Sequence, residues 1–388
     1  MIPHFIKYMG SKRDILEDIQ TVVDAMSVDA DCFCDLFAGT AIVSFAMSDR
    51  YRVISNDIQR YSAVFTHAYF GDYSNNKDVI EVLKEIREYA ELHVNNIRSK
   101  YSRLQELYGY DDNVSYEDFL TLETAQQGLL DMNLGDDYVF FTQHYSGTYW
   151  SLAQCLWIDA LRKSANLYQG SSLYYAVLAS LIFAMSYSSQ STGHFAQFRK
   201  ITKNNYLDIL NCRKRDVFNL FSKKLSEVMS LVKDNQLEYE VRTEDFRDCL
   251  KNIPRGSIVY ADPPYSNVHY SRFYHVIETL VRYDSPNVEH NGRYRDDRHQ
   301  SPFDQKRNVR SAFASLFKGV KDADSHIVLS YSNNGMLTPE EIMEIGDSIF
   351  GSDYESSMYE KEYSHMKMGR SDEYKMDVKE LLITYRKL

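Results

Sequence analysis

A four-residue segment, Asp262-Pro263-Pro264-Tyr265, has side chains suited to chemistry on an amino group that belongs to an aromatic ring system. Such a nitrogen is a poor nucleophile, because its lone pair is delocalised into the ring. The Asp262 carboxylate and the Pro263 carbonyl can each accept one of its N–H bonds, which prepares it for in-line attack on a methyl sulfonium. The two prolines fix the backbone that holds this carbonyl. Taken alone, the segment is also compatible with a Pro-Pro turn that ends a strand beside a buried tyrosine.

The segment follows one of seven short apolar runs that are rich in β-branched or aromatic residues and alternate with helical patterns. This alternation indicates an α/β sheet with crossover helices. Two runs end directly in acidic or small residues, at Asp35 to Gly39 and at Asp262, and open α/β sheets bind ligands at such carboxyl ends. The runs cover residues 32–37, 52–56, 239–242, 257–261, 325–331, 354–363 and 381–386.

The last two runs flank a polar stretch, residues 366–375, and therefore predict an antiparallel hairpin at one edge of the sheet. Between the second and third runs the chain is mostly helical in pattern and interrupts the sheet. We expect a catalytic domain of residues 1–70 plus 238–388 and a helical insertion of residues 71–237.

Apolar residues in the insertion recur at steps of three and four from Val82 to Tyr108, which predicts one long amphipathic helix. Two further helices are expected at residues 171–186 and 217–232. An acidic loop near residues 111–113 separates the long helix from the rest of the insertion.

The composition is that of an ordinary globular protein, since 44% of the 388 residues are hydrophobic and 26% are charged. The chain has no signal-peptide core and no run of about 18 apolar residues, so we expect a cytoplasmic protein that does not enter a membrane. The five cysteines form an odd set without a Cys-x-x-Cys pair. They predict reduced, structural thiols and no metal site.

The net charge of −11 opposes nucleic-acid binding when taken as a whole, but the location of the charges matters more than their sum. Residues 199–224 and 293–310 each contain more basic than acidic side chains. Each segment is compatible with a merely solvated face and with contact to a polyanion.

The tetrapeptide, its strand and the motifs around it resemble the alpha group of DNA adenine-N6 methyltransferases, to which the bacterial Dam enzymes belong. This resemblance covers residues 1–60 and 240–388 well and the insertion loosely. It implies a Rossmann-like S-adenosylmethionine-dependent methyltransferase sheet of seven strands, mostly parallel with an antiparallel C-terminal hairpin, and a large helical insertion. The matching segments, in the family's order, are Lys7-Tyr8-Met9-Gly10-Ser11-Lys12, Asp35-Leu36-Phe37-Ala38-Gly39-Thr40-Ala41, Asn56-Asp57-Ile58 and Glu244-Asp245-Phe246.

The resemblance implies that these segments bind S-adenosylmethionine, which carries an ammonium, a carboxylate, two ribose hydroxyls and an adenine. Asp35 would lie near the ammonium and Lys12 near the carboxylate, and Asp57 would accept both ribose hydroxyls. Asp245 and Phe246 would meet the adenine. Gly39 would let the backbone approach the ligand, whereas Ala41 stands where many relatives have a second glycine. The implied cofactor-binding residues are Lys7, Tyr8, Gly10, Lys12, Asp35, Phe37, Gly39, Asp57, Asp245 and Phe246.

The insertion falls where the alpha group keeps its target-recognition region, so the basic cluster that begins at Arg199 is expected to touch duplex DNA. Gln and Arg side chains read base edges, while Lys and Arg neutralise phosphates. The polar and aromatic segment 266–275 looks like a loop that closes over an extruded base, on which the ring of Tyr265 would stack. The expected DNA-binding residues are Arg199, Lys200, Lys203, Tyr270 and Arg272.

Three further segments also carry expectations. His269 and His275 are assigned to packing or backbone contacts, because the amino proton can leave to water. Residues 330–335 resemble a family segment that lines the target-base pocket. The polar and aromatic residues 143–150 form either a surface for DNA or a packed loop.

The resemblance implies site-specific methylation of adenine N6 in duplex DNA by base flipping and direct transfer, with Asp262, Pro263, Pro264 and Tyr265 as the catalytic residues. Methylation of the cytosine N4 amine is the alternative, although those enzymes more often carry Ser in place of Asp262. Families that act on RNA or on a protein glutamine usually carry Asn there. A catalytically silent DNA-binding module remains as a different class of function, and a cognate restriction or defence nuclease is a possible partner.

Overall fold

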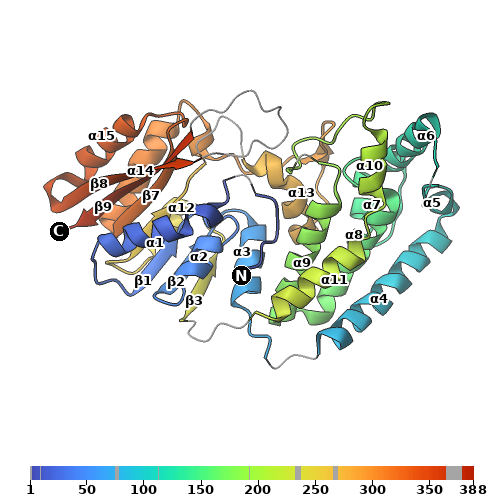
Figure 1. Ribbon diagram of the computed structural model, residues 1–388, viewed down its shortest axis with the longest axis horizontal. Helices are drawn as coiled ribbons and strands as arrows, with labels where there is room; N and C mark the ends of the chain where they lie inside the picture. Colours follow the sequence, from blue (N-terminus) through green and yellow to red (C-terminus); the bar gives the residue numbers. More distant parts are fainter. Residues whose placement is uncertain are drawn as a thin grey trace. The chain divides into compact units, whose positions relative to one another are not determined.

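The computed structural model describes residues 2–8, 10–74, 78–111, 113–191, 193–231, 237–264, 270–363 and 378–388. The chain forms two compact units, each assembled from three separate stretches (Figure 1). The sheet unit contains Gly10–Thr66, Lys233–Arg272 and His299–Leu388. The helical unit contains Met1–Met9, His67–Val232 and Phe273–Arg298, so it includes a stretch that comes after the tetrapeptide in the chain.

The sheet unit contains a seven-stranded sheet in the order β3-β2-β1-β4-β7-β9-β8. Strands β3, β2, β1, β4 and β7 are parallel to one another, β9 runs antiparallel to β7, and β8 runs antiparallel to β9. All seven predicted runs form strands, which confirms the predicted sheet and its C-terminal hairpin. The predicted polar connection of that hairpin lies outside the described residues. The strands are β1 (Cys32–Asp35), β2 (Arg52–Asn56), β3 (Tyr239–Arg242), β4 (Ile258–Ala261), β7 (His326–Ser332), β8 (Tyr354–Tyr363) and β9 (Val378–Lys387).

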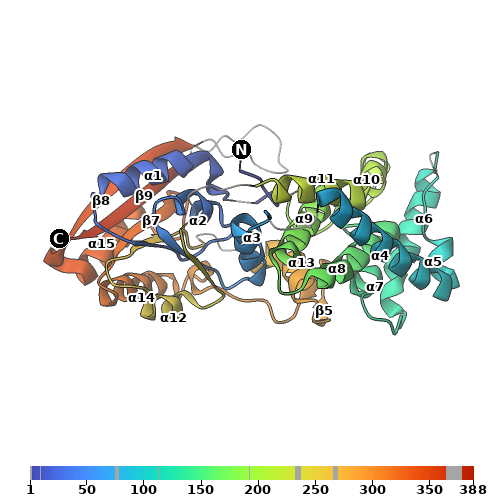
Figure 2. The same cartoon turned by 90° about the horizontal axis from the view of Figure 1, so that it is seen from below.

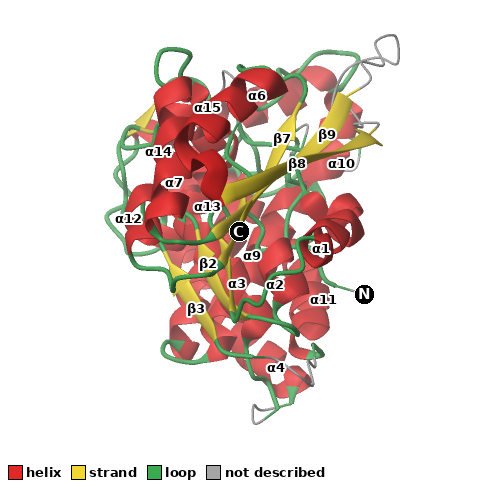
Figure 3. Ribbon diagram, turned by 90° about the vertical axis from the view of Figure 1, so that its left-hand side faces the viewer, coloured by secondary structure: helices red, strands yellow, loops and turns green. Residues whose placement is uncertain are grey.

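The central strands are apolar along most of their length because helices cover both of their faces. Every residue of β1, β4 and β7 is buried, as in parallel sheets with two covered faces. Figures 2 and 3 show α12, α14 and α15 on one side of the strands and α1 and α2 on the other. The helices of this unit are η1 (Lys12–Ile15), α1 (Leu16–Ala25), α2 (Ile42–Met47), α12 (Phe246–Lys251), η4 (Pro302–Asp304), α14 (Val309–Asp322), α15 (Pro339–Phe350) and η5 (Gly351–Asp353).

The helical unit is built around α9, which is buried along most of its length and packs against α8 and α11. Helices α4 and α7 pack against α8, and the boundary between the two units falls within α3 and within α13. The elements are α3 (Arg60–Phe70), α4 (Val79–Lys100), α5 (Ser102–Glu106), α6 (Tyr116–Gln127), η2 (Gly128–Asp131), α7 (Phe140–Tyr145), α8 (Leu152–Ala165), η3 (Asn166–Tyr168), α9 (Ser172–Ser188), α10 (Tyr206–Arg213), α11 (Val217–Met229), α13 (Tyr270–Arg282), β5 (Val288–Glu289) and β6 (Tyr294–Arg295).

The single long helix expected from Val82 to Tyr108 is wrong, because the structure divides it into α4 and α5 at Tyr101. This residue has an extended backbone, with φ −120° and ψ 99°. Its hydroxyl donates a hydrogen bond to Asp136 Oδ2 at 2.6 Å. A tertiary contact therefore ends a helix whose apolar periodicity continues past the break.

Candidate functional site

The sheet brings three predicted carboxylates to one edge. Asp35 ends β1, Asp57 follows β2 and Asp262 follows β4, and β1 pairs in parallel with both of the other strands. Parallel strands place their carboxyl ends together. The negative charges of Asp57 and Asp262 both raise the pKa of Asp35, which shows that the three groups are close enough to interact.

Asp35 is fully buried and is held by one residue of the following helix. Ser44 donates two hydrogen bonds to Asp35 Oδ2, from its backbone N at 3.0 Å and from its hydroxyl at 2.7 Å. Burial raises the pKa of Asp35 to about 7, and the Ser44 hydrogen bonds oppose that rise only in part. Within the described part of the chain, no donor contacts Oδ1. This oxygen therefore remains able to accept from a cation.

Asp57 is half-buried, and backbone N–H groups fix both of its oxygens. Gly39 N donates to Oδ2 at 2.9 Å, and Gln59 N donates to Oδ1 at 2.8 Å. Burial raises the pKa of Asp57 to about 6, although these hydrogen bonds lower it. A carboxylate oxygen has a second lone pair, so each can still accept from a hydroxyl.

The loop after β1 adopts backbone conformations that favour glycine. Gly39 has φ 51°, and Ala41 has φ 57° and ψ 18°, which is left-handed helical. Alanine in that region is strained, because its Cβ crowds the following carbonyl. A glycine would be relaxed at position 41, whereas the loop of this chain forms with alanine there.

Asn56 ties the ends of three strands together. Its amide nitrogen donates to Leu36 O at 3.1 Å and to Glu244 O at 3.2 Å, and its oxygen accepts from Glu244 N at 3.1 Å. The amide thus connects the loops that follow β1 and β3. These hydrogen bonds therefore fix the two predicted cofactor segments, which lie in those loops, relative to each other.

Asp262 lies against a buried cluster of charges. Lys12 Nζ is 3.1 Å from Asp262 Oδ1 and 2.6 Å from Glu380 Oε1. Burial raises the pKa of Asp262 to about 6, while Lys12 lowers it and Glu380 raises it further. The sequence indicated Lys12 as a partner of a cofactor carboxylate, whereas in the structure it contacts two carboxylates of the protein.

Glu380 was not among the candidates predicted from the sequence. It is 4% exposed and lies on β9, immediately before the apolar run that predicted this strand. A charged residue that extends a buried strand at its start is the sequence signal that could have drawn attention to it.

Asp245 and Phe246 occupy the start of α12 but differ in what they offer a ligand. Asp245 caps the helix and accepts two hydrogen bonds from the Arg247 guanidinium, at 2.8 and 3.0 Å. Burial raises the pKa of Asp245, but the Arg247 contacts outweigh it, so the net shift is downwards. Phe246 is 5% exposed and packs its ring against Phe37 and Phe303, with centroids 5.8 and 5.2 Å away. These three rings form the apolar floor beside Asp245.

The predicted N-terminal cofactor segment is divided between the two units. Lys7 and Tyr8 belong to the helical unit, where Lys7 Nζ lies 4.7 Å from the Tyr187 ring centre and Tyr8 stacks on Tyr274 at 4.6 Å. Gly10 belongs to the sheet unit and has φ 78°. A Cβ on Gly10 would approach the Tyr270 hydroxyl to 3.2 Å, so glycine permits this contact.

The residues after Pro264 are described only in part. Pro263 is buried and Pro264 is half-buried directly after β4, while Tyr265 and His269 lie outside the described residues. Arg272 is exposed on α13. His275 Nε2 is 2.9 Å from Phe195 O, a backbone contact of the kind predicted for it.

Much of the predicted basic cluster holds the helical unit together. Arg199 Nε donates to Gln190 O at 2.7 Å, and its guanidinium also pairs with Asp208. Arg213 is wholly buried in a two-point ion pair with Glu123. Lys200 and Lys203, the two lysines expected to bind DNA, are at the surface. Lys200 is exposed, and Lys203 Nζ lies 3.5 Å from Glu117 Oε1. The positive charge available to DNA here is smaller than the sequence count implies.

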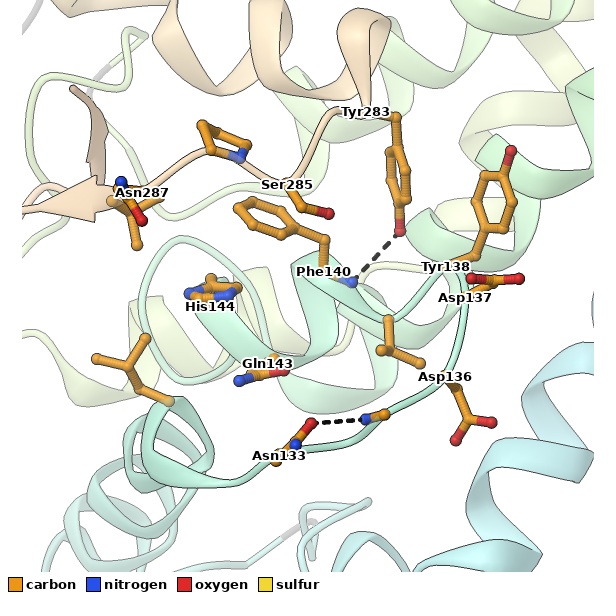
Figure 4. Close-up of a pocket in the computed structure, with 15 residues that line it drawn as sticks. Asn133, Asp136, Asp137, Tyr138, Phe140, Gln143, His144, Tyr283, Ser285 and Asn287 are labelled. Atoms are coloured by element: carbon orange, nitrogen blue, oxygen red, sulfur yellow. Dashed lines mark hydrogen bonds between the residues drawn. The ribbon is translucent and has the colours of Figure 1, made fainter. Parts of the chain in front are cut away.

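Residues 143–150 divide between a packed loop and a cavity wall. Tyr145, Tyr149 and Trp150 are fully buried, as a packed loop requires. Gln143 and His144 instead line a cavity of about 650 Å³ within the helical unit (Figure 4). None of the catalytic or cofactor residues named above lines this cavity, so it is separate from the carboxylate site.

The described residues contain neither a metal-ion cluster nor a membrane-spanning helix. No group of three or more His, Cys, Asp or Glu side chains in these ranges is arranged to hold a metal ion. Nor does any helix in the described part of the chain have the length and apolarity needed to cross a membrane. All five cysteines are buried free thiols.

The sheet order, with a reversed strand β9 and an Asp-Pro-Pro segment directly after the central strand β4, defines a Rossmann-like methyltransferase fold. A family model for D12 class N6 adenine-specific DNA methyltransferases matches residues 8–345. The chain belongs to this family.

The curated relatives that the chain matches are named as type II methyltransferases and modification methylases. The chain is 28% identical over 347 residues to the type II methyltransferase M.FokI of Planomicrobium okeanokoites and 25% identical over 347 residues to the modification methylase StsI of Streptococcus sanguinis. These matches cover 88% of this chain but 46% of each relative, so the chain spans about half the length of both. A match at 25% identity to the type II methyltransferase M.NlaIII of Neisseria lactamica covers 88% of this chain and 87% of that protein.

Proposed function

We propose that this protein transfers a methyl group from S-adenosylmethionine to the N6 amino group of adenine in duplex DNA. The observation that carries the proposal is the position of Asp262-Pro263-Pro264, directly after the central strand of the sheet and beside Asp35 and Asp57, in a chain of the D12 family. The carboxylate of Asp262 and the carbonyl of Pro263 supply two acceptors for one amino group.

The reaction needs an unreactive nitrogen to be made nucleophilic. Asp262 and Pro263 each accept one amino N–H bond, so the lone pair is directed out of the ring plane towards the methyl carbon. The prolines hold this carbonyl in place before the substrate arrives, which avoids the entropy loss of ordering a flexible loop. As the bond from nitrogen to the methyl carbon forms, the bond from that carbon to sulfur would break and the sulfonium would leave as a neutral thioether, while the Asp262 carboxylate stabilises the positive nitrogen. The excess proton then leaves to water.

The residues at the strand ends fit the proposed cofactor, which supplies an electrophilic methyl group on a sulfonium. Burial raises the pKa values of Asp35, Asp57 and Asp262 to about 7, 6 and 6. In the described part of the chain, the site therefore has more carboxyl groups than cationic side chains paired with them. A ligand with a sulfonium and an ammonium provides that positive charge. Asp35 Oδ1 would accept from the ammonium, and Asp57 would accept from the ribose hydroxyls.

We assign target recognition to the helical unit, from which Lys200 and Lys203 would contact phosphates. The reacting adenine must leave the base stack to reach Asp262, which the proposal attributes to base flipping. Because several relatives are named as modification enzymes, a cognate restriction nuclease is the proposed partner, with action inside the cell where its DNA is present.

Incubation of the purified protein with unmethylated DNA and S-adenosylmethionine, followed by single-molecule sequencing, tests the proposal. We expect N6-methyladenine at one recurring sequence and none with the Asp262→Ala protein. Methylation at cytosine N4 would replace adenine as the target. DNA binding without any methylation would instead support a silent binding module.

A further inference from the structure

Three charged side chains that are far apart in the sequence meet at one place in the sheet unit, and one of them is the candidate catalytic carboxylate, Asp262. Lys12 from η1 lies between Asp262, after β4, and Glu380 on β9. The hydroxyl of Ser330 on β7 donates to Glu380 Oε1 at 2.6 Å. Because β7 lies between β4 and β9 in the sheet, Ser330 extends the site by one strand beyond Asp262 and Glu380 extends it by two. The cluster lies wholly within the sheet unit.

This cluster is not what stability alone would select. Lys12 and Glu380 are 6% and 4% exposed, and the Asp262 side chain is 19% exposed. Burying an ion pair is often no more favourable than burying apolar residues of the same size, and here two carboxylates share one ammonium. The second carboxylate, Glu380, therefore adds a buried charge for which packing gives no reason.

We propose that Glu380 is a positioning residue for the transfer reaction. It holds the Lys12 ammonium where this group stabilises the Asp262 carboxylate but does not take the place of the amino group that Asp262 must accept. The proposal rests on the function proposed above. It assigns Glu380 to the control of Asp262, through Lys12, rather than to contact with substrate or cofactor.

The geometry explains why this division matters. Lys12 Nζ is 0.5 Å closer to Glu380 than to Asp262, at 2.6 against 3.1 Å, so it donates a hydrogen bond to Glu380 and contacts Asp262 as an ion pair. If Glu380 lost its charge, the ammonium would bind Asp262 more strongly. Asp262 would then be a weaker acceptor for the amino group, because a carboxylate in a tight ion pair has less charge to offer a second donor.

The titratable groups around Asp262 come from four elements: Lys12 from η1, Glu380 from β9, Asp35 from β1 and Tyr260 from β4. Lys12 lowers the pKa of Asp262 and Glu380 raises it. Neutralising Glu380 removes the raising influence and strengthens the lowering one. The Asp262 carboxylate must therefore ionise at a lower pH in a Glu380→Gln protein, even though that protein is the poorer catalyst.

The test compares full-length wild type with Glu380→Gln and with Glu360→Gln, which makes the same change on β8, where exposed Glu360 pairs with Lys379. For Glu380→Gln we expect kcat to fall by about tenfold or more, because Asp262 becomes a weaker acceptor for the amino group in the transition state. The dissociation constant of S-adenosylmethionine should stay within about twofold of wild type, because Glu380 does not contact it. The acid limb of kcat/KM should move to lower pH. Glu360→Gln should match wild type in all three.

Other outcomes decide against the proposal. Wild-type kcat and an unmoved acid limb in Glu380→Gln would overturn it, and so would a lower kcat with the limb unmoved, which indicates a structural role. If Glu380→Gln does not fold, Glu380→Asp decides by the same criteria, since it keeps the charge but withdraws it from Lys12. An inactive wild type would refute the proposed function. The role of Glu380 is refuted in a different way, by a wild type that is active and a Glu380 variant that does not respond as expected.

Discussion

The backbone N–H of Gly39 donates to Asp57 Oδ2, so the loop that follows the first strand is fixed by the carboxylate that follows the second. Asp57 also accepts from Gln59 N, and neither contact uses a flexible side chain as donor. A ligand that binds to Asp57 therefore also contacts the Gly39 loop, whose position depends on Asp57. Replacement of this carboxylate should affect both at once.

Asp57→Ala is expected to weaken S-adenosylmethionine binding by about tenfold or more, since hydrogen bonds to a charged group contribute roughly 1.5–3 kcal/mol. Isothermal titration calorimetry measures this directly. Asp29→Ala, at an exposed acid of the same unit, is the matched control and should bind as wild type does. Equal affinity for the Asp57 variant and wild type would remove Asp57 from the proposed ribose site.

Cofactor affinity should rise between pH 5 and pH 7. Burial raises the pKa values of Asp35 and Asp57 to about 7 and 6, so most of these carboxyls are protonated at pH 5 and ionise as the pH rises. A cationic ligand binds the ionised forms, so binding should release protons. Calorimetry in buffers of different ionisation enthalpy counts them. Affinity that is flat or falls over this range would contradict the assignment.

Asp262→Asn should abolish methyl transfer and leave cofactor binding within about threefold of wild type, because the amide retains the shape but not the charge that stabilises the developing cation. Single-turnover assays with labelled S-adenosylmethionine measure the first quantity and calorimetry the second. Full activity in the variant would exclude Asp262 as the amino-group acceptor.

The strands and the carboxylates at their ends could be predicted, whereas the Lys12 cluster could not. An apolar run such as 258–261 predicts a buried strand when helices cover both faces of the sheet. An acidic residue that directly follows such a run lies at the edge of the sheet. The contact between Lys12 and Glu380 joins residues 368 positions apart and depends on β9 lying next to β7. The amino-acid sequence around Lys12 or around Glu380 does not reveal that these two residues are in contact. The same reason explains Tyr101, where a contact to Asp136 overrides an unbroken helical pattern.

Arg199 and Lys200 are adjacent in sequence but should respond differently to replacement. Arg199→Ala removes contacts to Gln190 and Asp208 and should lower the melting temperature. Lys200→Ala removes an exposed charge and should leave stability unchanged while reducing the salt slope of DNA binding by about 0.9, as for the loss of one phosphate contact. Fluorescence anisotropy at several salt concentrations gives the slope. An unaltered slope for Lys200→Ala would mean that this side chain is merely solvated.

Ala41→Gly should leave the stability of the protein nearly unchanged, although glycine usually destabilises a folded chain. Ala41 is fully buried with φ 57°, and the left-handed conformation costs an L residue about 1–2 kcal/mol, against roughly 0.5–1 kcal/mol for the greater freedom of unfolded glycine. Loss of the buried methyl group costs roughly another 0.8 kcal/mol, so the three contributions nearly cancel and the free energy of unfolding, measured by urea denaturation, should change by less than about 1 kcal/mol. Ala38→Gly in the same loop is the control: Ala38 has no positive φ, so its replacement should destabilise. If both variants lose stability equally, the strain at Ala41 does not contribute to the stability of the loop.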